Sequence, residues 1–340
     1  MSETGNHDTL FPMENDTLKN EFIELLASSF NPVEINEIGR FFDNKYDHHR
    51  LSGTERHVTV SSRKAALILL DHLGDDRKCG FTRLLQFVVG LDGKTFMNRQ
   101  TELKGLETFL AGLGRFGKYY DFQTGKIVES GKKLQNPLNW GALRDDKAYD
   151  VTIMSVDVVR NSELVKKYGM KVMEKLYFKF QVFLDHLLSH YDGRVWNWAG
   201  DGGIIAFTFK DHQTRAVLCA LDIQRSLMVF QLSQDYPLPE NFSLRLAMDC
   251  GKVKFNSDTG KIVSDVINYA AHLEKAGTDP GKVTVSSRVR AALNAKFSSL
   301  FSIESDFEGQ QAFTTAVRLD ALAEPAEKPA ARPRKKPKTE

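Results

Sequence analysis

The chain has few cysteines, no long apolar run and little excess of charge of either sign. Its three cysteines, Cys79, Cys219 and Cys250, are odd in number and far apart among 340 residues. This spacing excludes a zinc knuckle and a disulfide framework, and it favours a reducing, cytoplasmic environment. The best apolar run, residues 84–91, is 8 residues long, whereas a membrane-spanning helix needs about 18. We therefore expect no membrane span, and the polar start of the chain shows no secretory signal.

The small net charge of +2 belongs to one end of the chain. Residues 324–340 hold six Lys or Arg and three acidic residues, so the remainder carries a net charge of −1. Charge therefore gives no support for nucleic-acid binding by the folded part. We expect residues 1–17 to be a flexible terminus and residues 321–340 to be a disordered basic tail. The KKPK run in this tail could contact nucleic acid or a membrane, or could simply aid solubility.

Residues 18–95 carry apolar residues at helical spacing. One run begins at Leu18 and ends before Asn31-Pro32, and further helices are expected after that break, at 62–73 and at 81–89. No His, Cys or carboxylate cluster accompanies them. We interpret this segment as a small all-α interaction domain with a protein partner, weakly similar to the death-like adaptor domains of bacterial defence proteins.

Residues 96–148 are expected to be a linker region. Gly112, Gly114 and Gly117 match the dinucleotide fingerprint GxGxxG. That motif needs a preceding strand, and residues 102–111 are instead typical of a helix. We therefore favour a turn that ends this helix over a nucleotide-binding loop.

Residues 149–320 have the pattern of an α+β domain. Short β-rich runs alternate with helical runs in the order βαββαβ, which is the ferredoxin-like pattern. Residues 162–191 are expected to form one long helix between the first strand and a hairpin at 194–209. A further helix is expected at 265–276, and a closing hairpin lies beyond it.

Two aspartates of this domain suggest chemistry. Asp157 ends the first strand, and Asp201 lies between glycines at the tip of the hairpin. If the two strands are neighbours, both carboxylates can hold divalent cations, which assist phosphoryl and nucleotidyl transfer. Taken singly, each aspartate could equally cap a segment or form a turn.

Residues 150–319 resemble the catalytic domain of the class III nucleotidyl cyclases, the adenylate and guanylate cyclase family. Five stretches follow in the family's order, and the two acids are 44 residues apart, as the family requires. The stretches are VTIMSVDVVRNS (151–162), VWNWAGDGGIIAF (195–207), LRLAMDCGKV (244–253), SDVINYAAHLEKAG (264–277) and PGKVTVSSRV (280–289).

The resemblance implies a homodimer with its active sites at the interface. Asp157, Asp201 and the carbonyl of Val158 would hold two Mg²⁺ or Mn²⁺ ions. These would lower the pKa of the ribose 3′-hydroxyl and bind the triphosphate, and the products would be a 3′,5′-cyclic nucleotide and pyrophosphate. Asn268 of the partner would orient the ribose. Backbone N–H groups of the following loop would contact phosphates, from Val159, Arg160, Asn161 and Ser162.

Three positions depart from the family pattern. His272 stands where the family has its transition-state arginine, four residues after Asn268, and histidine is largely neutral near pH 7. Asn197 stands where purine cyclases commonly have lysine, and Lys261 where they have an aspartate or a small polar residue. A cation at that position should disfavour the adenine amino group and favour a carbonyl oxygen. Uracil offers such oxygens, and guanine O6 would also suit Lys261.

The altered base positions resemble those of the bacterial anti-phage pyrimidine cyclases of the Pycsar type. The resemblance implies a cytoplasmic uridylate cyclase that makes cyclic UMP for a separate, cyclic-nucleotide-activated effector. An adenylate or guanylate cyclase in ordinary signalling is the first alternative. A catalytically inactive, cyclase-like binding module is the second, favoured by His272.

Overall fold

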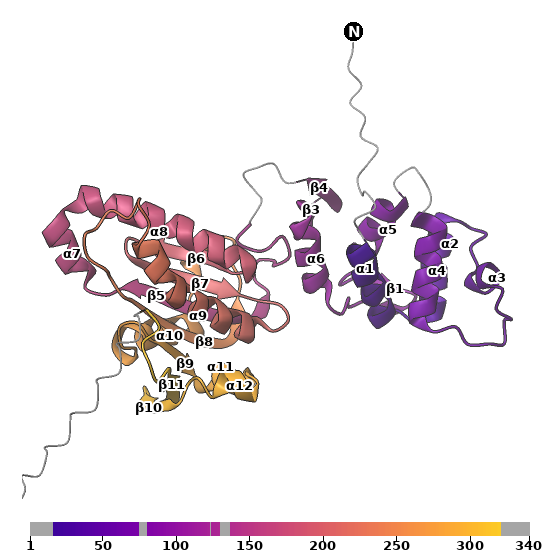
Figure 1. The fold of residues 1–340 in the computed structure, drawn as a ribbon. Coiled ribbons are helices and arrows are strands. Elements are labelled where there is room, and N and C mark those ends of the chain that lie inside the picture. Colours follow the sequence, from indigo (N-terminus) through magenta and orange to yellow (C-terminus); the bar gives the residue numbers. More distant parts are fainter. Residues whose placement is uncertain (1–15, 75–79, 123, 130–136, 321–340) are drawn as a thin grey trace, which may run out of the picture. The chain divides into compact units, whose positions relative to one another are not determined.

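A computed structural model describes residues 16–74, 80–122, 124–129 and 137–320 (Figure 1). Cys79, the expected tail and nearly all of the expected N-terminal segment lie outside these ranges. The chain divides into two compact units. Unit 1 contains residues up to 147 together with 255–257, and unit 2 contains 148–254 and the chain from 258 onward. In the described ranges, no helix combines the length and the hydropathy that crossing a membrane requires.

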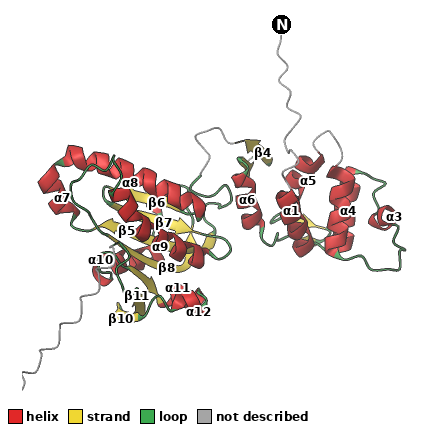
Figure 2. Cartoon of the chain, viewed as in Figure 1, coloured by secondary structure: helices red, strands yellow, loops and turns green. Residues whose placement is uncertain are grey.

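Unit 1 consists of helices and two short hairpins (Figure 2). Its first helix begins two residues before the expected Leu18. Its elements are α1 (Asp16–Ser29), α2 (Pro32–Phe42), α3 (His48–Ser52), α4 (Ser62–Gly74), α5 (Gly80–Val89), β1 (Thr95–Phe96), β2 (Arg99–Gln100), α6 (Leu106–Arg115), β3 (Lys118–Asp121) and β4 (Lys126–Glu129).

The break expected at Asn31-Pro32 is a helix start built from complementary hydrogen bonds. The Asn31 side chain accepts from the Glu34 N–H at 3.0 Å, and the Glu34 carboxylate accepts from the Asn31 N–H at 2.8 Å. This is a capping box, and Pro32 fits the first turn because its missing N–H would have no helical partner there. The short helix α3 was not anticipated, because five residues are too few to show a periodicity.

The range 96–148, expected to be a linker, is largely folded. It contains α6 and the hairpin of β3 and β4. Helix α6 starts at Leu106 rather than near 102, because Gly105 precedes it with a left-handed φ of 83°. Gly112 and Gly114 lie inside this helix, and Gly117 follows it with φ 69°. The GxGxxG spacing therefore belongs to a helix and its C-terminal turn.

Unit 2 is built around a seven-stranded sheet. Its elements are β5 (Ala148–Val158), α7 (Asn161–Tyr168), α8 (Met170–His190), β6 (Arg194–Ala199), β7 (Gly202–Phe207), α9 (His212–Gln231), β8 (Leu244–Lys254), the 3₁₀ turn η2 (Thr259–Lys261), α10 (Asp265–Gly277), β9 (Val283–Ser286), α11 (Ser287–Ala292), α12 (Ala295–Ser298), β10 (Ile303–Phe307) and β11 (Gln310–Thr314).

The strand order is β10-β11-β9-β8-β5-β7-β6. The four strands from β5 to β8 thus stand in the order fourth, first, third, second, and all their pairings are antiparallel. This is the expected ferredoxin-like arrangement, extended by the parallel strand β9 and the closing hairpin.

The two faces of the sheet are covered by different helices. Met154 and Val156 of β5 share a buried core with Phe180 of α8 and Ile223 of α9. Side chains alternate between faces along a strand, so Asp157 faces the side on which α10 packs (Figure 1). The fold therefore places this aspartate opposite the main core, where a carboxylate can remain accessible.

The long helix expected at 162–191 is two helices. Gly169 separates α7 from α8 with φ 79° and ψ 156°. An L-residue adopts such angles only with strain, so glycine permits this break without a sterically costly Cβ. The apolar spacing continues across Gly169 and therefore did not reveal it.

Candidate active site

Asp157 and Asp201 line one pocket in unit 2. In the antiparallel pairing of β5 with β7, Asp157 stands opposite Gly202, the residue after Asp201. Both aspartates border a hollow of about 260 Å³, together with Glu274 and residues of the β6–β7 hairpin such as Ala199 and Gly203. The structure thus brings together the two carboxylates that the sequence analysis selected.

The environment of Asp201 is unfavourable for a second negative charge. Burial raises the pKa of Asp201 above its ordinary value, and the nearby charge of Asp157 raises it further. A hydrogen bond with the Asn161 side chain partly opposes this rise in pKa. Asn161 is itself held by Tyr177, whose hydroxyl donates to Asn161 Oδ1 at 2.6 Å. The pocket is therefore polar and acidic, as a cation site requires.

Two further charged residues belong to this site and were missed in the sequence. Arg245 of β8 stands directly opposite Asp157 in the sheet register and donates from Nη2 to Asp157 Oδ2. Its Nε lies 2.9 Å from Oε1 of Glu274 on α10. Burial, followed by the charge of Asp157, raises the pKa of Glu274 to about 7.

A signal for Glu274 was present in the sequence. Glu274 follows Val266 and Ala270 at helical spacing, on the buried side of α10. An acid on an apolar helical stripe needs a buried partner, and that partner is Arg245. The pairing itself joins residues 29 positions apart, so no local pattern could identify it.

The donor set fits a hard divalent cation, which prefers carboxylate oxygens. In the described ranges, no three His, Cys, Asp or Glu side chains are arranged to hold a metal ion by themselves. Asp157 and Asp201 would therefore need further oxygens, from backbone, water or substrate phosphates, to complete a coordination shell. The Arg245 guanidinium also occupies one oxygen of Asp157.

The expected phosphate loop is only partly suited to that role. The N–H of Val159 was expected to contact a phosphate. It donates instead to the Ser243 carbonyl at 2.9 Å, so it is not available for that role. Arg160 has a left-handed φ of 57° and precedes α7. Asn161 and Ser162 form the first turn of α7, where backbone N–H groups lack intrahelical acceptors. Asn161 and Ser162 therefore remain suited to donate backbone N–H groups, as expected.

The Arg160 side chain lies apart from the acidic pocket. It borders a separate hollow of about 580 Å³, together with Lys167 and Arg318. The structure therefore does not bring Arg160 into the group formed by the two aspartates.

The expected ribose and transition-state residues also lie outside the acidic pocket. Asn268 and His272 are exposed on α10, and neither lines the hollow beside Asp157. His272 Nδ1 lies 2.9 Å from a carboxylate oxygen of Glu308. The chain therefore presents these two side chains on its surface, and neither lines the pocket of its aspartates.

The two expected base-contacting residues lie on joined elements. The hydroxyl of Thr259 in η2 donates to the carbonyl of Trp196 in β6. Asn197 follows Trp196 at a β-bulge and is exposed. Lys261, at the end of η2, is also exposed and pairs with Asp258 at 2.9 Å. The elements that carry Asn197 and Lys261 are thus joined, and neither residue lines the pocket of the aspartates.

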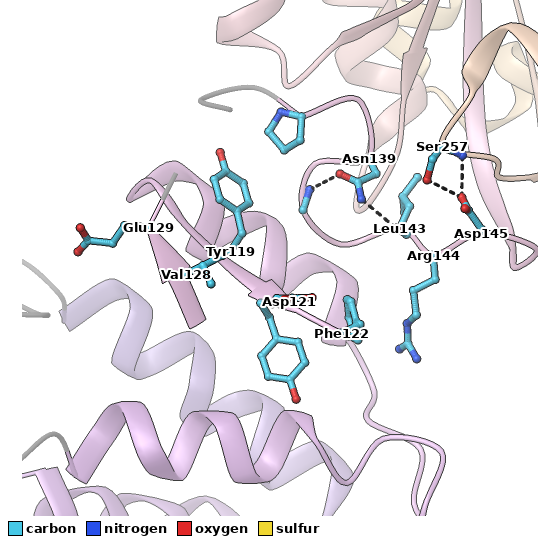
Figure 3. Close-up of a pocket in the computed structure, with 13 residues that line it drawn as sticks. Tyr119, Asp121, Phe122, Val128, Glu129, Asn139, Leu143, Arg144, Asp145 and Ser257 are labelled. Atoms are coloured by element: carbon cyan, nitrogen blue, oxygen red, sulfur yellow. Dashed lines mark hydrogen bonds between the residues drawn. The ribbon is translucent and has the colours of Figure 1, made fainter. Parts of the chain in front are cut away.

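Unit 1 has a hollow of its own, of about 480 Å³ (Figure 3). Aromatic residues of β3 and the turn after it, including Tyr119 and Phe122, line it with residues of the segment 137–145. At one edge, Asp145 Oδ1 accepts from the Ser257 N–H at 2.6 Å and from its hydroxyl at 2.7 Å. None of the expected site residues lines this hollow.

Residues 144–317 match the family model described as the adenylate and guanylate cyclase catalytic domain. This range covers just over half of the chain. The chain belongs to this cyclase family. The match spans the sheet of unit 2 and includes every residue of the acidic pocket.

Among curated proteins, the cyclase domain is similar to "Putative adenylate cyclase 3" of Rhizobium meliloti (strain 1021). The two are 25% identical over 144 residues, which are 42% of this chain and 23% of that protein. The chain thus spans less than a quarter of the length of that relative.

Several solved cyclase domains are also similar. The guanylate cyclase domain from Catenaria anguillulae in complex with GTP is 18% identical and covers 51% of this chain and 99% of its own, with a TM-score of 0.43. The adenylyl cyclase CyaB from P. aeruginosa is 15% identical and covers 52% and 98%, with a TM-score of 0.42.

Proposed function

We propose that this chain converts a nucleoside triphosphate, with UTP favoured, to the 3′,5′-cyclic nucleotide and pyrophosphate. The observation that carries the proposal is the acidic pocket in a domain of the cyclase family. Asp157 of β5 and Asp201 in the turn before the neighbouring strand β7 line it together. Structural roles such as capping would not require two acids to share one partly buried hollow.

Two bound Mg²⁺ or Mn²⁺ ions would supply activation of the ribose 3′-hydroxyl and charge neutralisation of the triphosphate. Asp157 and Asp201 would hold them, with the Val158 carbonyl as a further oxygen donor. Asn161 and Ser162 would direct amide N–H groups from the start of α7 towards phosphate oxygens. Asn161 would also fix the Asp201 side chain through its hydrogen bond.

The division of site residues supports a homodimer. Within one protomer, the aspartates line the pocket while Asn268 and His272 are exposed on α10. A two-fold related partner would bring its Asn268 to the ribose and its His272 to the reacting phosphate, giving two sites per dimer. Neutral histidine donates one hydrogen bond and carries no charge, so we expect a slower reaction than an arginine at this position would support.

The exposed pair of Asn197 and Lys261 supports a base rich in carbonyl oxygens. The Lys261 ammonium can donate to O4 or O2 of uracil, and the Asn197 amide can both donate and accept. Lys261 must leave Asp258 to do so, which is feasible because an exposed ion pair contributes little energy. Cytosine presents an amino group in place of O4 and therefore fits less well.

The proposal includes a role for the product and a role for unit 1. A cyclic UMP product would suit a cytoplasmic second messenger in anti-phage defence, read by a separate effector. The helices of unit 1 would then bind the protein that controls synthesis. The first alternative is an adenylate or guanylate cyclase, and the name of the Rhizobium relative favours adenylate. The second is an inactive module, favoured by His272.

Product analysis distinguishes these functions. The purified chain is incubated with ATP, GTP, CTP and UTP, singly and mixed, with Mn²⁺, and the products are identified by mass spectrometry. We expect cyclic UMP to dominate and to disappear in Asp201→Asn. Asp235→Asn is the matched control, because Asp235 is 86% exposed and lies outside the pocket.

The other outcomes are equally specific. Cyclic AMP or cyclic GMP as the main product would retain the cyclase proposal and refute the base assignment. The absence of every cyclic product would refute catalysis by the isolated chain and favour the inactive module.

A further inference from the structure

We infer that the Arg245 guanidinium moves from Asp157 to Glu274 when a divalent cation binds. This exchange of ion-pair partners controls access of the cation to Asp157. In the structure, Arg245 bonds to the carboxylate of Asp157 that the cation would need. Glu274 is the second carboxylate, to which the guanidinium moves when the cation binds. This inference deepens the proposed function and rests on its metal site.

The sheet register explains why Arg245 competes with a cation. Asp157 and Arg245 are directly opposed on β5 and β8, and their side chains are 25% and 23% exposed. A partly buried ion pair is screened less by solvent than a surface pair. A cation that binds Oδ2 of Asp157 must therefore displace Arg245 or share the oxygen with it.

The contact with Glu274 is close but incompletely formed. Arg245 Nε and Glu274 Oε1 are 2.9 Å apart. Both atoms are buried, and in the described part of the chain neither has a well-aligned hydrogen-bond partner. A small rotation of the guanidinium would align this pair and loosen its bond to Asp157. The structure thus contains both the present partner of Arg245 and an adjacent, unsatisfied one.

The charges of the cluster also favour the exchange. Three carboxylates, those of Asp157, Asp201 and Glu274, line the pocket, and the Arg245 guanidinium pairs with those of Asp157 and Glu274. When all four groups are ionised, two negative charges remain uncompensated. One divalent cation neutralises them, provided that Arg245 stays within the cluster on Glu274. Arg245 and Glu274 are therefore positioning residues for the cation.

The test is a double-mutant cycle on Mn²⁺ binding by the full chain without nucleotide. Free Mn²⁺ is measured by electron paramagnetic resonance. Arg245→Met should tighten binding, and Glu274→Gln alone should weaken it about fivefold or more. In the Arg245→Met background, Glu274→Gln should weaken binding clearly less than it does in the wild type, because only the direct charge of Glu274 is then lost and not its contact with Arg245. Lys275→Met is the control, because it removes an exposed positive charge from the same helix as Glu274. It should tighten binding less than Arg245→Met does.

The same cycle can also refute the exchange. If Glu274→Gln weakens Mn²⁺ binding equally in both backgrounds, Glu274 acts as a ligand or as a simple charge, and the exchange is refuted. If the wild-type chain binds no Mn²⁺, or Asp201→Asn binds it unchanged, the proposed metal site fails as well. Loss of binding in Asp201→Asn together with an additive cycle refutes the exchange alone.

Two measures keep the test valid if Arg245→Met does not fold. Arg245→Gln removes the charge and retains a shorter hydrogen-bonding side chain, so it replaces Arg245→Met in the cycle. Crystal structures with and without Mn²⁺ give an independent readout. Arg245 should contact Asp157 without the metal and Glu274 with it, and an unchanged Arg245–Asp157 bond in the metal-bound protein would refute the exchange.

Discussion

His212 is a buried histidine outside the acidic pocket. It is the first residue of α9, is 7% exposed, and its Nδ1 lies 2.8 Å from the Thr152 hydroxyl. Burial lowers the pKa of His212, and the charges of Asp150 and Asp211 only partly oppose this. The folded protein therefore keeps this imidazole neutral at a pH where the unfolded chain takes up a proton.

The sign of the pH dependence follows from linkage. The unfolded histidine has a pKa of about 6.5, so below that pH the unfolded state binds more protons and the free energy of unfolding decreases. His212→Gln should reduce the loss of unfolding free energy between pH 7.5 and 5.5 by about 1 kcal/mol. Urea unfolding at the two pH values measures this, with His190→Gln, an exposed histidine of α8, as the control. An equal loss in wild type and His212→Gln would contradict the assignment.

The hairpin of β6 and β7 holds Asp201 close to β5 because Gly202 has no side chain. A Cβ at Gly202 would lie 2.6 Å from the Val156 carbonyl oxygen and 3.2 Å from Asp157 Oδ1. The first contact is with backbone in the middle of the sheet, which cannot easily move. The hairpin itself would therefore have to shift away from Asp157.

Gly202→Ala tests this close approach. We expect a loss of about 1–3 kcal/mol in unfolding free energy, from overpacking, and at least a tenfold loss of cyclase rate, because misplaced catalytic groups are costly. Gly260→Ala is the control for stability, because its Cβ would lie 3.6 Å from the nearest atom, in ordinary contact. Full activity in Gly202→Ala would show that the separation of the two aspartates is not critical.

Most elements of unit 2 could be predicted, because short alternating runs and glycines are local signals. The strand before Asp157 and the hairpin around Asp201 are such cases, whereas the adjacency of the two was only a condition until the pairing of β5 with β7 showed it. The break at Gly169 could not be predicted, since the apolar spacing of α7 and α8 continues through it. The fold resemblance likewise did not reveal that the Val159 amide bonds to Ser243.

The sequence alone could not identify the ion pairs of Arg245 with Asp157 and Glu274. Glu274 carries a local signal, as an acid on the buried side of α10, but that signal does not identify Arg245 as its partner. Their partnership depends on the register of β5 with β8 and on the packing of α10. Residue types and spacing do not specify either feature.

At the scale of the whole molecule, the boundary between the units does not follow a single cut in the chain. Unit 1 includes Phe255–Ser257, which lies between β8 and η2. The Phe255 N–H donates to the Lys147 carbonyl at 2.9 Å, and the Asp146 N–H donates to the Phe255 carbonyl at 3.0 Å. Asp145 adds its two bonds to Ser257. The segment 144–147 therefore anchors the turn that leads to Lys261 and Asn268.

Two fragments of the chain test this anchoring. A fragment of residues 149–320, which starts at the expected domain boundary, should melt about 5–10 °C below a fragment of residues 144–320. The reason is that it loses several hydrogen bonds, each worth about 0.5–1.5 kcal/mol. Thermal unfolding followed by circular dichroism measures the difference. Equal melting temperatures would show that residues 144–148 contribute nothing to the stability of the cyclase domain.

The proposed division of site residues between two protomers has a quantitative consequence. Asp201→Asn removes a pocket carboxylate, and Asn268→Ala removes the proposed ribose contact on α10, so each variant alone should be nearly inactive. In a heterodimer of the two, one interface site receives both damaged residues and the other receives neither. Random association of equal amounts makes half of the dimers heterodimers, so the mixture should show about a quarter of wild-type activity. Co-expression with two affinity tags isolates the heterodimer, which should show about half of wild-type activity because one of its two sites is intact. If both residues served the same protomer's site, every heterodimer site would be damaged, and the mixture would be no more active than the mean of the two variants.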